Sequence, residues 1–362
     1  MFRDYQHRFA RVRRKARRGG GWRWGVLLAV IAILVGCWCW HKSRPKPTSP
    51  ARLVKPAKAP PKAAPPITLS RQAPGDFPRP ARGVLEAQVA LARGGISPGP
   101  IDAALGSQTR AAISVFQQEA NLPQSGQLDT NAQMRLTLDA PVLTTYEVTT
   151  NDLARLQPLG KTWLAKSQQS ALEYETELEL VAEKSHSHPE LIRRLNPGVN
   201  WTNVAPGTAL RIPAVDYPAY KGQAASITIH LAGKYLEVFD EQTNLMAHFP
   251  CSIAQHVEKR PVGELHVAVV APDPNYTFDP ELFPESPEAR QLQMKLILPP
   301  GPNNPVGVAW IGLDRTGYGI HGTPNPEQVG RTESHGCFRL ANWDAEYLEK
   351  LVWVGMPVRV EP

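Results

Sequence analysis

The amino-acid sequence predicts a multidomain α+β protein. We expect a mainly-β C-terminal domain, a small helical domain, a βααβ module and an N-terminal transmembrane helix. An uncharged apolar run near the N-terminus has the composition of a membrane span. After residue 83, apolar residues recur at helical spacing, and from Ser226 onward apolar and polar residues alternate as they do in strands.

The N-terminal 40 residues combine positive charge with an apolar run. Residues 1–23 carry nine Arg or Lys and one acid, Asp4. Residues 24–40 read WGVLLAVIAILVGCWCW, with tryptophan at both ends, as in an aromatic belt. This length is at the short end of what spans a bilayer. Because positively charged flanks stay on the cytoplasmic side, we expect residues 1–23 to be cytoplasmic, residues 24–40 to be a signal anchor in the cell inner membrane, and the C-terminal domain to be periplasmic (extracytoplasmic).

An alternative interpretation of the same segment stays open. Residues 34–37, Leu-Val-Gly-Cys, resemble a lipobox, at which a bacterial lipoprotein is cut and acylated on cysteine. Cys37 is therefore an alternative lipidation site. The long basic region and the bulky Trp38 fit a lipobox poorly, and no Ala-x-Ala cleavage site follows the apolar run. An uncleaved signal anchor is the favoured interpretation.

Residues 41–82 are rich in proline, lysine and alanine, which is typical of an extended linker. The net charge of the chain divides near the end of this linker. Residues 1–82 contain 19 of the 40 Lys and Arg but only 2 of the 33 Asp and Glu, so residues 83–362 contain 21 and 31. The folded part is therefore acidic, which argues against nucleic acid as a partner.

Residues 83–140 have the pattern of a small helical domain. A first helix begins near Leu85 and ends at Gly94, and a second runs from about Ser107 to Ala120 with one apolar face. With the Phe116-Gln117 pair, the segment resembles the small peptidoglycan-binding domain, which implies contact with glycan strands. One departure is Ala103, where that family usually has glycine.

Residues 146–213 resemble a LysM-like module. A strand opens at Tyr146, two helical stretches follow, and residues 204–213 read as a closing strand. The segment is long for such a module, which implies an insertion near residues 155–175. His186 and His188 lie in a polar turn, where we expect them to be solvated.

Residues 226–362 form the predicted mainly-β domain, with a hairpin turn at residues 240–244. The segment 273–295 is longer and richer in Pro and Glu than strands require, and we expect a lid or substrate-side loop there. Cys251 lies in an apolar strand and is predicted to be a core residue.

The sequence GIHGT at residues 319–323 and SHGCFRL at residues 334–340 contain the candidate catalytic residues. Cys337 follows a Ser-His-Gly turn, and His321 lies upstream as a base that could activate the thiol. Zinc binding by His321, His335 and Cys337 is a competing interpretation, but the spacing of a typical zinc site is missing. We therefore predict no metal and no cofactor.

This pattern resembles the active-site signature of the L,D-transpeptidase (YkuD-type) family, and the resemblance extends over residues 226–360. It implies that Cys337 is the nucleophile and that His321 is the general base and acid. The resemblance also implies roles for six other residues. Ser334, His335 and Gly336 would shape the turn and the oxyanion hole, and Arg339, Gly322 and Tyr318 would bind the substrate.

The function implied is peptidoglycan remodelling on stem peptides, either by 3–3 crosslinking or by lipoprotein attachment. Two alternatives stay open: an L,D-carboxypeptidase or endopeptidase on the same stems, and a non-catalytic cell-wall anchor. The expected partners are stem peptides, glycan strands and inner-membrane lipid, and the family resemblance implies covalent inhibition by carbapenems.

Overall fold

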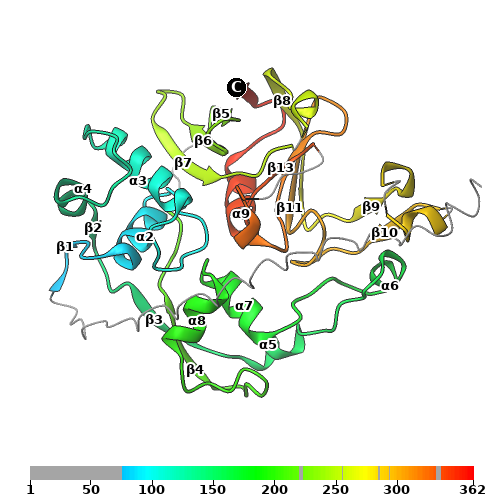
Figure 1. The fold of residues 1–362 in the computed structure, drawn as a ribbon, viewed down its shortest axis with the longest axis horizontal. Helices are drawn as coiled ribbons and strands as arrows, with labels where there is room; N and C mark the ends of the chain where they lie inside the picture. Colours follow the sequence, from blue (N-terminus) through cyan, green and yellow to red (C-terminus); the bar gives the residue numbers. More distant parts are fainter. Residues whose placement is uncertain (1–75, 220–222, 255, 284–285, 293, 332–335) are drawn as a thin grey trace, which may run out of the picture. The chain divides into compact units, whose positions relative to one another are not determined.

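The computed structural model describes residues 76–362 except 220–222, 255, 284–285, 293 and 332–335. The predicted basic segment, the anchor and most of the linker lie outside these residues. Within the described part of the chain, no helix is both long and apolar enough to cross a membrane. Pro65–Pro362 form one compact unit. We divide its described part into a helical domain (76–142), a βααβ module (143–213) and a C-terminal domain (224–362), drawn from cyan to red in Figure 1.

The helical domain contains the predicted helices. They are α2 (Val84–Arg93), α3 (Ser107–Glu119) and α4 (Thr130–Arg135). Strand β1 (Arg79–Pro80) pairs antiparallel with β2 (Thr137–Leu138), so the fold begins before residue 83 and includes the last residues of the predicted linker.

An ion pair and a left-handed backbone position are two notable features of this domain. Arg79 and Glu86 form a buried ion pair at 2.7 Å, which ties β1 to α2. Ala103 has a φ of 62°, a backbone conformation that favours glycine, and this accounts for the family's usual residue at that position.

The βααβ module has the predicted order of strand, helices and strand. β3 (Leu143–Glu147) pairs antiparallel with β4 (Ala209–Pro213). Thr149 and Asp152 form a capping box at the start of the first helix, which fixes where the chain turns out of β3. The helices are α5 (Thr150–Ala154), α6 (Trp163–Ser167), α7 (Glu177–Lys184) and α8 (Pro189–Leu195). The assignment as a LysM module remains a prediction.

The prediction that His186 is solvated was wrong. Its ring stacks on Trp343 with centroids 5.4 Å apart and also packs against Tyr217. Burial lowers the pKa of His186 to about 3, so the ring is neutral. His188, also expected to be solvated, is half-buried and caps α8, its Nδ1 accepting a hydrogen bond from the Glu190 N–H at 3.1 Å. The turn packs against the C-terminal domain, a contact that the local sequence does not reveal.

In the described residues, eight strands of the C-terminal domain form one sheet in the order β13-β12-β11-β8-β14-β5-β6-β7. Their bounds are β5 (Ser226–His230), β6 (Tyr235–Phe239), β7 (Leu245–Pro250), β8 (Gly263–Pro272), β11 (Ala309–Leu313), β12 (Gly319–His321), β13 (Phe338–Arg339) and β14 (Pro357–Glu361). The pairs β12–β13 and β14–β5 are parallel, and the others are antiparallel. A bridge between Ser252, just beyond β7, and Arg339 in β13 joins the two edges of the sheet.

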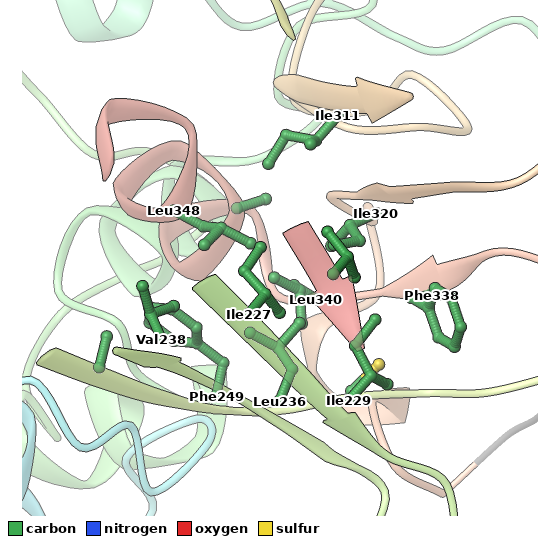
Figure 2. Packing of buried hydrophobic residues seen from close by; sticks show 14 of the residues in the cluster. Ile227, Ile229, Leu236, Val238, Phe249, Ile311, Ile320, Phe338, Leu340 and Leu348 are labelled. Carbon is green, nitrogen blue, oxygen red and sulfur yellow. The ribbon is translucent and has the colours of Figure 1, made fainter. Parts of the chain in front are cut away.

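The core of this domain lies between the sheet and helix α9 (Asn342–Leu351) (Figure 2). Strands alternate as predicted, with Ile227 and Ile229 buried in β5 and Leu236 and Val238 buried in β6. Cys251 is fully buried in the same core, which confirms its prediction as a core residue.

The predicted loop at 273–295 leads through a short hairpin, β9 (Tyr276–Phe278) and β10 (Leu296–Leu298). A separate hydrophobic cluster joins this hairpin to the insertion of the βααβ module. Trp163 of α6 stacks on Phe278 with ring centroids 4.3 Å apart, and Leu172 is fully buried beside them. Short 3-10 turns complete the described elements, at Val257–Lys259, Pro280–Leu282, Ala289–Gln291 and Pro326–Gln328.

Candidate active site

Three neighbouring strands bring the predicted catalytic residues together. His321 is paired with Trp310 of β11 on one side and with Arg339 of β13 on the other. Because paired positions point to the same side of a sheet, these three side chains share one face. Cys337 immediately precedes β13, two residues from Arg339, so the alternation of side chains predicts the same face for it.

His321 is buried and neutral. Its Nδ1 lies 2.7 Å from the carbonyl oxygen of Gly322. A carbonyl oxygen only accepts, so Nδ1 must carry a hydrogen, which leaves the lone pair on Nε2 as the basic position. Burial, with a smaller contribution from the positive charge of Arg339, lowers the pKa of His321 to about 4, although the bond to the Gly322 carbonyl opposes this shift.

Trp310 holds the ring of His321 from one side, with ring centroids 5.6 Å apart and a tilt of 26°. Two glycines make room for its indole. A Cβ placed on Gly319 would lie 2.6 Å from the Trp310 ring, and one on Gly312 would lie 2.9 Å from its Nε1. Sequence reasoning missed Trp310; the paired glycines at 312 and 319 are its only local signal.

The Cys337 sulfur lies at the start of β12. It is 3.6 Å from the Gly317 carbonyl oxygen, and the Gly319 backbone hydrogen-bonds to it. Burial raises the pKa of the Cys337 thiol, and this outweighs the opposing effects of Gly319 and Arg339. Near neutral pH the site therefore favours the thiol over the thiolate, because the desolvation of the sulfur is the larger effect.

Arg339 is the charged centre of the site. Its backbone is fixed by two hydrogen bonds with Ser252, at 2.9 and 3.0 Å, and its half-buried guanidinium acts on the pKa of His321, Cys337 and Tyr276. Tyr276, on β9, was not predicted. It lies in the segment expected to face the substrate, but no spacing in the sequence distinguishes it.

The other predicted residues have different environments. Gly322 is buried, its N–H donates to the Ala309 carbonyl at 3.2 Å, and its own carbonyl is used by His321, so its contacts favour a positioning role. Tyr318 is half-buried against the core, beneath the guanidinium of Arg315. Gly336 is half-buried, and its place in an oxyanion hole stays a prediction.

Ser334 and His335 lie outside the described residues, so their predicted roles stay predictions. The same holds for the zinc alternative, which includes His335. Among the residues that the structure describes, no group of three His, Cys, Asp or Glu side chains could hold a metal ion.

Comparisons with known proteins agree with this geometry. Residues 224–360 match the family model of the L,D-transpeptidase catalytic domain, and residues 81–136 match one described as "Putative peptidoglycan binding domain". These matches support the transpeptidase and wall-binding predictions for the two domains.

Curated relatives show the same similarity. The "Putative L,D-transpeptidase YkuD" of Bacillus licheniformis is 27% identical over 188 residues, which are 51% of this chain and 93% of that protein. The "Probable L,D-transpeptidase YbiS" of Escherichia coli is 30% identical over 168 residues, 45% of this chain and 53% of that protein. The chain thus spans about half the length of the E. coli relative. A solved L,D-transpeptidase from Xylanimonas cellulosilytica is 14% identical and aligns with 81% of this chain and 100% of its own, at a TM-score of 0.34, too low to support an argument.

Proposed function

We propose that this chain is an L,D-transpeptidase that remodels peptidoglycan through a cysteine acyl-enzyme. One observation carries the proposal: adjacent strands place Cys337, His321 and Arg339 at one site, with Nδ1 of His321 committed to the Gly322 carbonyl. This arrangement leaves a neutral imidazole nitrogen as a base beside a protonated thiol. The family match of residues 224–360 supports the reaction class.

Acylation begins from two neutral groups. The sulfur of Cys337 attacks the L-centre carbonyl of the third stem residue, a diamino acid such as meso-diaminopimelate, while Nε2 of His321 accepts the thiol proton. Backbone N–H groups at Gly336 and Cys337 are the proposed donors to the resulting oxyanion. The C–N bond to the terminal D-Ala then breaks, and His321 returns its proton to the leaving amine, so that a thioester remains.

The thioester is resolved by an amine. The side-chain amine of a neighbouring stem attacks the thioester carbonyl, loses a proton to His321 and releases the thiol, giving a 3–3 crosslink. The amine of a lipoprotein gives protein attachment by the same chemistry. Water gives the carboxypeptidase or endopeptidase alternative. Arg339 is the proposed contact for a substrate carboxylate, because it is the cation that acts on both reacting groups.

We also propose that the N-terminal segment tethers this catalytic unit to the inner membrane, with Cys37 as the alternative lipid attachment site. The helical domain and the βααβ module would then hold the enzyme on glycan strands. The test compares the wild-type chain with a Cys37→Ser variant, both produced in cells given a radioactive fatty acid. Carbonate extraction shows whether each chain stays in the membrane, and the radioactivity shows whether it carries a lipid. Label on the wild type alone would favour the lipoprotein.

The test of the reaction uses the full-length chain in detergent and disaccharide-tetrapeptide as substrate. Mass spectrometry should show a dimer that lacks one D-Ala, and Cys337→Ser should give none. Tripeptide monomer as the sole product would support the hydrolytic alternative. If neither product formed, the chain would be better described as a wall anchor.

A further inference from the structure

The carbonyl that fixes His321 is itself tightly packed. A Cβ on Gly322 would lie 2.3 Å from Oδ1 of Asn342, and a Cβ on Gly307 would lie 2.0 Å from the same oxygen and 2.6 Å from the Gly322 carbonyl carbon. Neither position therefore has room for a side chain. Asn342, at the start of α9 and 1% exposed, packs directly against the peptide whose oxygen binds Nδ1 of His321.

Asn342 is in turn held by the βααβ module. Its Nδ2 donates to Oε1 of Glu183 in α7 at 2.7 Å and to the carbonyl of Pro302 at 3.0 Å. Both hydrogens of the amide are thus used, so the orientation of the side chain is fixed. One of the two acceptors comes from outside the C-terminal domain.

The βααβ module also forms hydrogen bonds with the loop that contains Pro302, the second acceptor of the Asn342 amide. The backbone of Leu172 bonds to the Pro300 carbonyl at 2.8 Å and to the Asn303 N–H at 2.9 Å. The side chain of Asn303 donates to Glu179 of α7 at 2.5 Å. Pro302 and Gly307 therefore belong to a segment whose path depends on the module.

We propose that Asn342, held by Glu183, is a positioning residue for the catalytic histidine: it keeps the Gly322 carbonyl where it accepts the Nδ1 proton of His321. The βααβ module is then part of the catalytic apparatus, whatever affinity for glycan it contributes. This inference rests on the proposed role of His321 as the base, but the position of the ring can be measured without turnover.

The protonation state of Glu183 decides which substitution can serve as a control. Burial raises the pKa of Glu183 to about 8, with Glu179 and Glu346 adding to the rise, while the bond from Asn342 and the charge of Arg155 oppose it. In either protonation state an oxygen accepts the bond from Asn342. A glutamine at this position keeps such an oxygen, whereas a leucine of similar size does not.

The experiment compares Glu183→Leu, Asn342→Ala and Asn342→Asp with Glu183→Gln in the full-length chain. Acylation by a carbapenem is followed by mass spectrometry, and the His321 tautomer by ¹⁵N NMR of histidine-labelled protein. The wild type should show the Nδ1–H form. We expect the first three variants to lose that form and to acylate on the order of tenfold more slowly or worse, as for a misplaced catalytic group. KM for the tetrapeptide should change less than kcat.

Glu183→Gln should keep both the Nδ1–H tautomer and the acylation rate of the wild type. Arg93→Ala is the matched control, because it removes bonds between the helical domain and residue 214 without touching Asn342. Folded Glu183→Leu and Asn342→Ala proteins with the wild-type tautomer would overturn the proposal. If the wild type were not acylated at all, the proposed function would fail, and the tautomer comparison would still decide this inference.

Discussion

Burial determines the protonation of both reacting side chains. It raises the pKa of the Cys337 thiol and lowers that of His321 to about 4, so near neutral pH the site holds a thiol and a neutral imidazole. In the proposed mechanism, the thiol proton therefore moves to His321 as the sulfur attacks the substrate. The stacked Trp310 and the bound Nδ1 restrict the ring to the orientation that this transfer uses.

This protonation state predicts the pH dependence of acylation. A base works only when unprotonated, so the rate should fall only as the pH drops toward the value of about 4 at which His321 gains its proton. The measurement is kcat/KM for acylation from neutral to acidic pH, restricted to conditions in which the protein stays folded. An acid limb centred near the ordinary histidine value of 6.5 would show that the ring is not desolvated in solution.

The two described cysteines should differ in reactivity. A carbapenem should add one covalent mass to the full-length chain, and peptide mapping should find it on Cys337, which is partly exposed. Cys337→Ser should lose the adduct, and Cys251→Ser should keep it, since burial strongly disfavours the Cys251 thiolate. An adduct on Cys251, or activity that depends on added zinc, would contradict the mechanism.

At the scale of elements, the β9–β10 hairpin depends on a helix from another part of the chain. Burial raises the pKa of Tyr276 in this hairpin, and the nearby Cys337 and Arg339 also act on it, while Phe278 stacks on Trp163 of α6. The insertion of the βααβ module therefore supports one wall of the active site.

Removing the ring of Trp163 should loosen the hairpin. Trp163→Ala removes the ring that stacks on Phe278, and because Trp163 is only half-buried we expect a loss of about 2 kcal/mol in local stability, below the range for a fully buried tryptophan. Limited proteolysis should cut faster in residues 279–295, and acylation of Cys337 should slow. Leu164→Ala is the control, because Leu164 is its neighbour and is 44% exposed. Equal proteolysis of both variants would argue against this support.

The strands and helices could be predicted because their signals are local. Alternation in β5 and β6 and the Gly94 stop of α2 are written into short windows of sequence. Cys337 and His321 could be proposed as a catalytic pair because they occur in a recognisable motif. Contacts such as Trp163 with Phe278, or Glu183 with Asn342, join segments more than a hundred residues apart, and neither partner has an unusual neighbourhood in sequence.

At the scale of the whole described molecule, the helical domain also contacts the C-terminal domain. Ser97 donates from its Oγ to Asp344 of α9 at 3.1 Å, and its N–H bonds to the His248 carbonyl at 2.8 Å. Gln108 of α3 donates to the Val329 carbonyl at 2.6 Å, in the segment between His321 and Cys337. The helical domain and the C-terminal domain are therefore packed together within the compact unit.

The contacts of β1 predict how much stability a chain shortened at its N-terminus loses. A chain that begins at residue 83 loses β1 and leaves Glu86 buried without Arg79, and breaking such a pair costs about 3–5 kcal/mol. Thermal unfolding should show a lower midpoint for residues 83–362 than for 76–362. In the shorter chain, Glu86→Leu should recover part of the loss. Equal midpoints would mean that β1 contributes little.

The bridge from Ser252 to Arg339 has a consequence for the order of folding. The short strand that follows Cys337 is completed by β12 on one side and, on the other, by residue 252, which lies 87 positions before Arg339. Pairings of such high sequence separation form late, because the intervening chain must be ordered first. The nucleophile is thus assembled at the closing of the sheet. In a partly folded chain, Cys337 would therefore lack the strand pairings that place it near His321 and Arg339.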